Sequence, residues 1–226
     1  MKLDIIYRCC EQEVEGRVKE IRPTWFNKIN CLQTFIEAIK QAHDLLGEII
    51  FLHDGPKGKL YNAIPKQYTI KEVNYMQNEL SLLETFKIAD SLNENIYFVE
   101  DDYLHLPNSI RMIASCVDNF KLLTGYDHLD RYKRTDDITI NKETIAFSRK
   151  SNCHWRTAES TCCTWATTRE LWRGVIGILA KEYKLRDREF FRALYTKHNI
   201  RLWSPIPGVT TQVDQCLSPG IDWEKI

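Results

Sequence analysis

The stretch Tyr97–Tyr103 (YFVEDDY) decides the fold and the site that this sequence predicts. It begins inside the apolar run Asn95–Val99, which is typical of a strand buried on both faces of a parallel sheet. Three adjacent carboxylates, Glu100, Asp101 and Asp102, follow the run directly. Because like charges repel, such a cluster favours a bound cation. Ligands of open α/β sheets bind at the carboxyl ends of the strands, which is where these acids fall.

The chain before this stretch predicts an alternation of strands and helices. Leu3–Tyr7 and Glu48–Leu52 are apolar runs like Asn95–Val99, so we expect two more buried strands. Apolar residues at helical spacing follow the three strands: Trp25 to Ile39 after an Arg-Pro-Thr start at residue 22, about Lys71 to Leu92, and Ile110 to Phe120. This order predicts an α/β fold, with a Rossmann-like, mostly parallel central sheet flanked by helices.

The second half of the chain is less regular. Residues 125–152 are polar and too many for a simple connection, so we expect them to carry function or a small hairpin. Thr157–Ala166 predicts a strand, and the capping-box pattern Thr167-x-x-Glu170 predicts the start of a helix. A last helix is expected from Asp187.

The composition of the chain argues against several classes of protein. The 226 residues contain 31 basic and 31 acidic side chains, and this zero net charge gives no footprint for nucleic acid. No apolar run reaches about 18 residues, so no membrane span is expected. The eight cysteines include the adjacent pairs Cys9-Cys10 and Cys162-Cys163, a poor geometry for disulfides, and no C-x-x-C pair that favours structural zinc. With no secretory signal visible, we expect reduced thiols in a cytoplasmic protein.

The strand that ends in Glu100-Asp101-Asp102 resembles the D-x-D-type motif of GT-A glycosyltransferases, in the E-D-D form that some of them use. The second strand, ending in Asp54-Gly55, resembles the family's base-recognition position. The order of elements fits from about Leu3 to Leu123. Residues 126–132 (YDHLDRY), 154–157 (HWRT) and 206–211 (IPGVTT) are similar to small glycosyltransferases of bacteria and of large algal DNA viruses, of the capsid-glycan type.

The resemblance implies a GT-A fold and a single glycosyltransferase domain over residues 1–226. Residues 1–105 would bind the nucleotide sugar and residues 106–226 the acceptor, and the chain could be a fragment of a larger protein. The implied activity is metal-dependent transfer of a hexose or deoxyhexose from a nucleoside-diphosphate donor, with UDP favoured, to a glycan or glycoprotein. The implied cofactor is Mn²⁺ or Mg²⁺, and a viral origin would place the enzyme in the host cytoplasm.

The resemblance also assigns roles on the donor side. Asp102 is the expected metal ligand, and Glu100 and Asp101 would lie toward the ribose and behind the metal. Asp54 could accept a hydrogen bond from the ring N–H of uracil, or it could simply form the turn before Gly55. Arg8, at the end of the first strand, could face the nucleotide or be a surface cation.

Reaction and acceptor residues are expected in the second half. In many GT-A enzymes an acid at the start of a late helix is the base of an inverting transfer, a position that Asp187 resembles, although it could be an ordinary helix cap. Glu159 is the rival base. Arg156 could clamp a phosphate and Trp155 could stack on a sugar beside His154, while a buried Trp and a surface Arg remain the alternative.

Other functions stay open at this point. Relatives often place a histidine where Gln212 stands, so a non-catalytic carbohydrate- or nucleotide-binding module is one alternative. A sugar nucleotidyltransferase is another, but it usually needs a basic, Gly-rich loop after the first strand, where this chain has Cys9–Glu13 (CCEQE). A glycoside hydrolase would need carboxylates facing each other across a cleft. The pair Asp127-His128 is expected to order its loop.

Overall fold

A mixed sheet of nine strands, in the order β3-β2-β1-β4-β9-β6-β10-β8-β7, runs through the described part of the chain. The protein is represented by a computed structural model, which describes residues 1–12, 22–133, 143–214 and 216–226. The strands of this sheet are β1 (Leu3–Cys9), β2 (Leu46–Asp54), β3 (Thr69–Val73), β4 (Asn95–Glu100), β6 (Leu122–Leu123), β7 (Ile145–Ser148), β8 (Cys153–Ala158), β9 (Trp165–Thr167) and β10 (Leu202–Ile206).

The first four strands of that order are parallel, and the sequence predicts three of them, β1, β2 and β4. Tyr7 of β1 lies in register with Phe51 of β2 on one side and with Val99 of β4 on the other. The carboxyl ends of β1, β2 and β4 therefore meet at one edge of the sheet. This edge receives Asp54, the last residue of β2, and Glu100, the last residue of β4.

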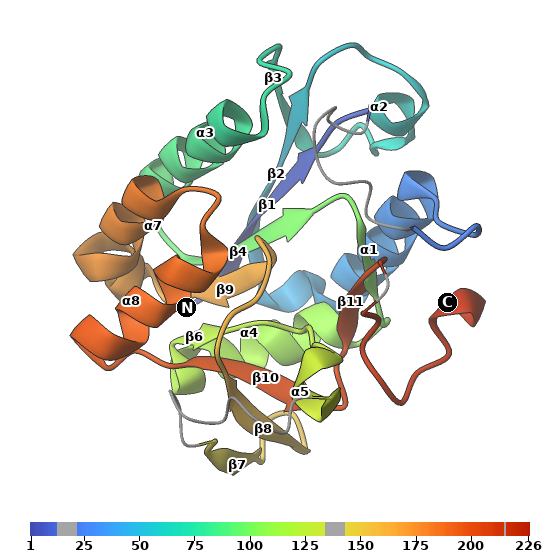
Figure 1. Ribbon diagram of the computed structural model, residues 1–226. Helices are drawn as coiled ribbons and strands as arrows, with labels where there is room; N and C mark the ends of the chain where they lie inside the picture. Colours follow the sequence, from blue (N-terminus) through green and yellow to red (C-terminus); the bar gives the residue numbers. More distant parts are fainter. Residues whose placement is uncertain (13–21, 134–142, 215) are drawn as a thin grey trace.

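Helices cover both faces of the sheet (Figure 1). One face packs against α1 (Lys28–Ala42) and α4 (Ser109–Phe120), and the other against α3 (Asn78–Ser91), α7 (Gly177–Tyr183) and α8 (Asp187–His198). Successive side chains of a strand point to opposite faces, so both faces of the central strands must be apolar. The β4 run meets this need, since Tyr97 and Val99 join one core and Ile96 and Phe98 the other. The result is a helix–sheet–helix sandwich.

Shorter elements complete the described chain. They include α2 (Lys59–Ala63), α5 (Asp130–Lys133), α6 (Arg169–Leu171), the single-turn segments η1 (His43–Leu45), η2 (Trp172–Ile176, a π turn) and η3 (Trp223–Lys225), and the strands β5 (Tyr103–His105) and β11 (Thr210–Gln212). The last two strands form an antiparallel pair, with Gln212 opposite Tyr103. This pairing brings the C-terminal segment against the chain that directly follows the acidic triplet.

Two predicted elements of the first half differ in the structure. The apolar stripe from Lys71 to Leu92 is not one helix, because Thr69–Val73 pairs as β3 with the edge of β2 and α3 begins only at Asn78. Met76 interrupts the helical path with a φ of 51°. The first helix begins at Lys28 rather than near Trp25, with Asn27 as its N-cap. Trp25 instead packs beside a small core around Trp223.

The second half also departs from the prediction. Thr157–Ala166 is not one strand, since β8 ends at Ala158 and β9 begins at Trp165. The N-cap of the next helix is Thr168, whose Oγ1 accepts from the backbone N–H of Leu171 (3.5 Å). The hairpin expected within residues 125–152 is partly found, as β7 pairs antiparallel with β8. Residues 134–142 of that stretch lie outside the described residues.

All eight cysteines lie in the described part of the chain and are free thiols. Among the helices that the structure describes, none has both the length and the apolar character to cross a lipid bilayer.

Candidate nucleotide-sugar site

The acidic triplet lies at the carboxyl edge of the sheet, and each carboxylate has a side-chain cation beside it. All six side chains are less than one fifth exposed. The pairs are Glu100 with Arg8, Asp101 with Lys28 (Oδ2 to Nζ, 3.0 Å), and Asp102 with Arg22 (Oδ2 to Nη2, 2.7 Å). The chain itself therefore compensates much of the charge that the sequence argument assigned to a bound cation.

Asp102 lies where the C-terminal segment meets the motif. Its Oδ2 accepts hydrogen bonds from Arg22 Nη2 and from Gln212 Nε2 (3.0 Å). Its Oδ1 is buried and has no hydrogen-bond partner among the described residues. Leaving such an atom unpaired costs about 1–3 kcal/mol, and more for a charged group. A divalent cation on Oδ1 would remove this cost, and a carboxylate oxygen is a ligand that Mg²⁺ and Mn²⁺ accept.

The structure puts the side chain of Gln212 against Asp102. The β5–β11 pairing produces this contact between residues that are 110 positions apart. The amide of glutamine also carries an oxygen that suits Mg²⁺ or Mn²⁺.

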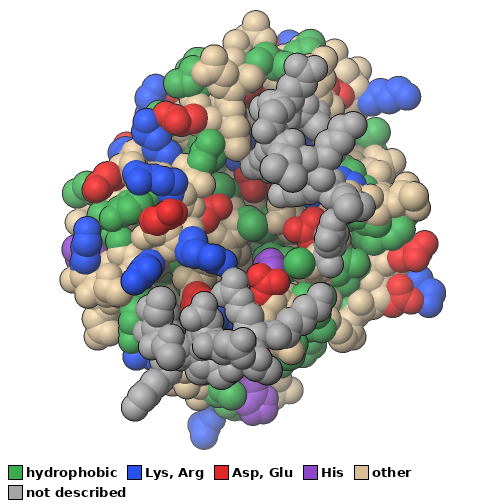
Figure 2. All heavy atoms as spheres, in the orientation of Figure 1, with side chains coloured by type: hydrophobic (Ala, Val, Ile, Leu, Met, Phe, Trp, Pro, Cys, Tyr) green, Lys and Arg blue, Asp and Glu red, His purple; other side chains and the backbone are tan. Residues whose placement is uncertain are grey.

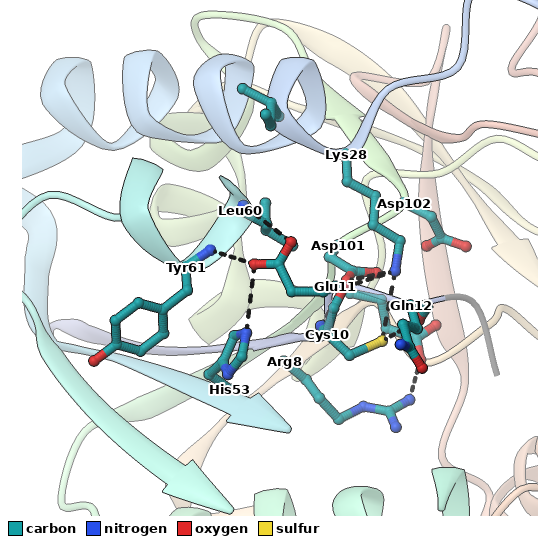
Figure 3. Close-up of polar contacts among 12 residues, drawn as sticks. Arg8, Cys10, Glu11, Gln12, Lys28, His53, Leu60, Tyr61, Asp101 and Asp102 are labelled. Carbon is teal, nitrogen blue, oxygen red and sulfur yellow. Dashed lines mark hydrogen bonds and ion pairs between the residues drawn. The ribbon is translucent and has the colours of Figure 1, made fainter. Parts of the chain in front are cut away.

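Asp101 faces away from Asp102, toward the end of β1. Its Oδ2 accepts from the backbone N–H of Cys10 (2.9 Å) and from Lys28 Nζ, which reaches down from α1 as Figure 3 shows. Burial raises the pKa of Asp101, and Lys28 opposes that rise. Burial lowers the pKa of Lys28, but the charges of Asp101 and Cys10 and the hydrogen bonds to them together outweigh burial, so the net pKa is raised. These contacts favour a role for Asp101 in holding the strand ends together.

Glu100 and Arg8 form a pair across β1 and β4. The guanidinium of Arg8 also donates to Oδ1 of Asn78 (2.5 Å), the first residue of α3. The backbone N–H of Glu100 donates to Thr164 Oγ1 (3.1 Å). Arg8 is therefore partly buried and fully engaged at the strand edge, and it is not a surface cation.

Asp54 ends β2 and caps the next turn. Its Oδ1 accepts from the backbone N–H groups of Tyr75 (2.7 Å) and Met76 (3.0 Å). The turn-forming interpretation is therefore correct for one carboxylate oxygen. The second oxygen makes no hydrogen bond to the described residues, so the structure leaves the uracil interpretation available.

Glu11, in the loop after β1, holds this loop against the start of α2. Glu11 accepts from the backbone N–H groups of Leu60 (3.2 Å) and Tyr61 (2.8 Å) at the start of α2, and its Oε1 lies 3.8 Å from His53 Nε2 (Figure 3). Burial raises the pKa of Glu11, but these backbone hydrogen bonds outweigh it and the net pKa is lowered. Residues 13–21, which follow, lie outside the described residues.

The helix α8 places Asp187 beside Cys163. Asp187 is the first helical residue and Arg186 is the N-cap, so the interpretation of Asp187 as a cap is wrong. Cys163 Sγ donates to its Oδ1 (3.6 Å). Burial first, and then the charges of Asp187 and Glu100, raise the pKa of Cys163 well above its usual value. The same two charges act on Cys162, so both acids face this pair of thiols.

Glu159 and Arg156 lie in another part of the structure. Burial lowers the pKa of Arg131, and the charge of Glu159 is the first to oppose it, so Glu159 lies near Arg131. Arg156 pairs with Asp127, which is 1% exposed, and its guanidinium carbon lies 4.5 Å from the centre of the Tyr132 ring. Arg156 is 5% exposed, so its contacts are those of a structural ion pair.

The two predicted acceptor residues point to opposite faces of β8. Trp155 is fully buried, its ring centre lies 4.8 Å from that of Phe120, and its Nε1 donates to Ser151 Oγ (2.9 Å). No face of this ring is exposed for a sugar, so the structure favours the core alternative. His154 is exposed, and its ring lies 5.2 Å from that of Phe147.

The face shown in Figure 2 is hollowed over the central strands, with acidic side chains around the hollow and basic ones beside it. Asp214 adds to the acids of the site. Burial raises its pKa, the charge of Asp102 raises it further, and His128 and Arg22 oppose the rise. Asp214 also accepts the backbone N–H of Cys216, and Cys216, His128 and Asp130 form a group of possible metal ligands.

Sequence reasoning missed several of these residues. The partners Arg22 and Lys28, the amide of Gln212 beside Asp102, and Asp214 come from segments far from the motif in sequence. Arg22 and Lys28 both fall in the helical segment predicted after the first strand, which is a signal that they lie near its carboxyl end. Gln212 was singled out from the sequence, but its contact with Asp102, like the position of Asp214, depends on the path of the C-terminal segment.

Solved structures share this fold at low sequence identity. The 4-diphosphocytidyl-2C-methyl-D-erythritolsynthase from Anaerococcus prevotii superposes with a TM-score of 0.51 and 12% identity, over 90% of this chain and 86% of that one. This similarity shows the fold alone. The fold is the one that the sequence predicts, that of nucleotide-diphospho-sugar transferases of the GT-A type.

Two further similarities are weaker, and we draw nothing from them. A nucleotidyl transferase from Methanothermobacter thermautotroptrophicus has a TM-score of 0.49 at 12% identity, over 90% of this chain and 86% of that one. A glucosyl-3-phosphoglycerate synthase from Mycobacterium tuberculosis, solved with Mn²⁺, UDP and phosphoglyceric acid, has a TM-score of 0.45 at 13% identity, over 75% and 56%. No protein-family model matches the chain, and no curated protein matches it in sequence.

Proposed function

We propose that this protein is a metal-dependent glycosyltransferase that moves a hexosyl or deoxyhexosyl group from a UDP-sugar to a glycan or glycoprotein. The observation that carries the proposal is the environment of Asp102. This carboxylate lies at the carboxyl end of β4, one of its oxygens is buried without a partner, and Gln212 of the C-terminal segment lies beside it. Such a place suits a cation that binds a diphosphate.

Donor binding follows from the positions of the neighbouring groups. Asp102 and Gln212 would hold Mn²⁺ or Mg²⁺, and the ion would neutralise charge on the departing nucleoside diphosphate. Asp54 would accept the ring N–H of uracil through the oxygen that does not cap the turn at Tyr75 and Met76. Arg8 and Glu100 would fix the strand edge next to the ribose.

The reaction needs a base for the acceptor hydroxyl. We assign this role to Asp187, because α8 carries it to the thiol pair that also faces Glu100. The acceptor oxygen would form a bond to the anomeric carbon of the sugar as the bond to the diphosphate breaks. The electrons of that bond leave with UDP, the hydroxyl proton goes to the Asp187 carboxylate, and the anomeric configuration is inverted. Glu159 lies near Arg131 and is the less favourable candidate.

A sugar nucleotidyltransferase is an alternative. It usually has a basic, glycine-rich loop after the first strand to bind a triphosphate, and in the described start of this loop Glu11 is instead hydrogen-bonded to the start of α2. The non-catalytic binding module remains the second candidate, since an engaged triplet also suits ligand binding without turnover.

Hydrolysis of UDP-sugars in the absence of acceptor distinguishes a glycosyltransferase from a non-catalytic binding module. The wild-type protein is expected to release UDP when Mn²⁺ is present and to stop on chelation. Asp102→Asn should lose this release, while the matched control Asp44→Asn, at an exposed pair with Arg111, should keep it. Release without metal, or an active Asp102→Asn variant, would contradict the proposal. Metal-dependent binding without any release would establish the binding module.

A further inference from the structure

A second cluster of metal-ligating side chains lies beyond Asp214. His128 precedes α5, Asp130 is the first residue of α5, and Cys216 belongs to the C-terminal segment. One ligand atom from each lies within 4.8 Å of the other two. Asp130 Oδ1 is 3.5 Å from His128 Nδ1 and 3.9 Å from Cys216 Sγ. All three residues are partly buried.

These separations match a tetrahedral zinc site. With bonds of about 2.0 Å to nitrogen and oxygen and about 2.3 Å to sulfur, ligand atoms around zinc lie about 3.3 Å (N to O) and about 3.5 Å (S to O) apart. The observed distances of 3.5 Å and 3.9 Å are slightly longer. Small side-chain movements would bring the three atoms onto one ion, with a water molecule in the fourth position.

Neighbouring groups hold two of the ligands in place. The hydroxyl of Tyr126 donates to the carbonyl oxygen of Cys216 (2.7 Å), and the Tyr126 ring lies 5.1 Å from the ring of His128. Asp214 Oδ1 accepts the backbone N–H of Cys216 (2.6 Å). The backbone N–H of Asp130 donates to His128 Nδ1 (3.1 Å). Ordered supports of this kind are typical of metal sites.

We propose that His128, Asp130 and Cys216 bind Zn²⁺, at a site separate from the metal position at Asp102. Imidazole and thiolate ligands select zinc over Mg²⁺ and Mn²⁺, whereas the oxygens of Asp102 and Gln212 select the harder ions. On binding, the Cys216 thiol releases its proton to solvent, and the metal replaces the Asp130 N–H at Nδ1. No atom is oxidised or reduced. The absence of a C-x-x-C pair does not bear on this site, because it uses a single cysteine, Cys216, which lies 86 positions after Asp130.

The ion would fasten the C-terminal segment to the chain before α5. That segment carries Gln212, whose amide contacts Asp102, and Asp214, whose charge acts on Asp102. Zinc would therefore hold the last part of the donor site in place without contacting the donor. This role does not depend on whether the protein transfers a sugar.

Cobalt substitution tests the site directly. Metal-free protein is titrated with Co²⁺, whose bond to a thiolate gives a charge-transfer absorption band, and Zn²⁺ is then added to displace the cobalt. We expect a thiolate band that saturates at one Co²⁺ per chain and that Zn²⁺ removes. Cys216→Ser should abolish the band, and His128→Ala should weaken Zn²⁺ binding about tenfold or more. Circular dichroism checks that each variant is folded.

Two control variants test whether the absorption band comes from the site at Cys216 and not from another thiol or from the metal position at Asp102. Cys153→Ser removes a half-buried thiol elsewhere and should keep the band, and Asp102→Asn should keep it as well. A folded wild-type protein without a band would overturn the proposal, and so would a band that survives in Cys216→Ser. Loss of the band in Asp102→Asn would show that the two positions are one site, which also contradicts the proposal.

Discussion

Replacing Lys28 by methionine tests how much the ion pair between Lys28 and Asp101 stabilises the folded protein. The change keeps the aliphatic stem but removes the cation from Asp101, whose side chain is 12% exposed. Breaking a buried ion pair from one side costs about 3–5 kcal/mol. Because Lys28 is 16% exposed and water reaches part of the pair, we expect the lower end, about 3 kcal/mol at neutral pH. For a chain of this size, that is a fall in Tm of about 6–12 °C.

The loss should depend on pH with a definite sign. In the folded protein the pKa of Asp101 is already raised, with Lys28 opposing the rise, so removal of Lys28 raises it further. A carboxyl group whose pKa is higher in the folded than in the unfolded state binds its proton more tightly in the folded state. Its contribution to stability therefore falls as the pH rises from its unfolded-state pKa to its folded-state pKa. The deficit of Lys28→Met should therefore be full above the new pKa and shrink as acid protonates Asp101.

Urea unfolding of the two proteins at pH 8 and pH 5 measures this difference. Lys40→Met is the matched control, because Lys40 forms an exposed pair with Glu37 and should cost no more than about 1 kcal/mol at either pH. An equal deficit for Lys28→Met at the two pH values would refute the reasoning. A deficit no larger than that of the control would do the same.

Four further outcomes are expected. Trp155→Ala should lower stability by about 3–5 kcal/mol in urea unfolding because the ring is fully buried against Phe120. His154→Ala, on the exposed face of the same strand, should change stability by less than about 0.5 kcal/mol. Burial lowers the pKa of His105 to about 3, so the protein should lose stability as pH falls below about 6.5, and His105→Gln should lose less over that range. Asp187→Asn should reduce sugar transfer about 10²–10⁴-fold while UDP binding with Mn²⁺, measured by calorimetry, is unchanged.

The parallel half of the fold could be predicted because its signals are local. β1, β2 and β4 are continuous apolar runs, and each is found at the predicted place with slightly longer bounds. The helical stripe that begins at Lys71 was misleading. Its first residues satisfy helical spacing, but hydrogen bonding to the edge of β2 determines their conformation. Such a tertiary contact overrides local periodicity.

The candidate site was predictable only where it follows a strand. Glu100, Asp101 and Asp102 follow β4 in sequence, so their position at the sheet edge was visible from the pattern. Gln212 reaches Asp102 through the β5–β11 pair, which joins segments more than a hundred residues apart. The sequence does not show which face of the sheet Trp155 points to. Alternate side chains of β8 are buried and exposed, and the register of the strand in the sheet decides which of them are buried.

Calorimetric titration of UDP, GDP, ADP and dTDP, each with and without Mn²⁺, tests the central claim most directly. The account predicts that UDP binds, that its binding requires Mn²⁺, and that Asp102→Asn abolishes the metal dependence. Failure of all four nucleotides to bind to the folded protein, or equal UDP binding with and without Mn²⁺, would contradict it.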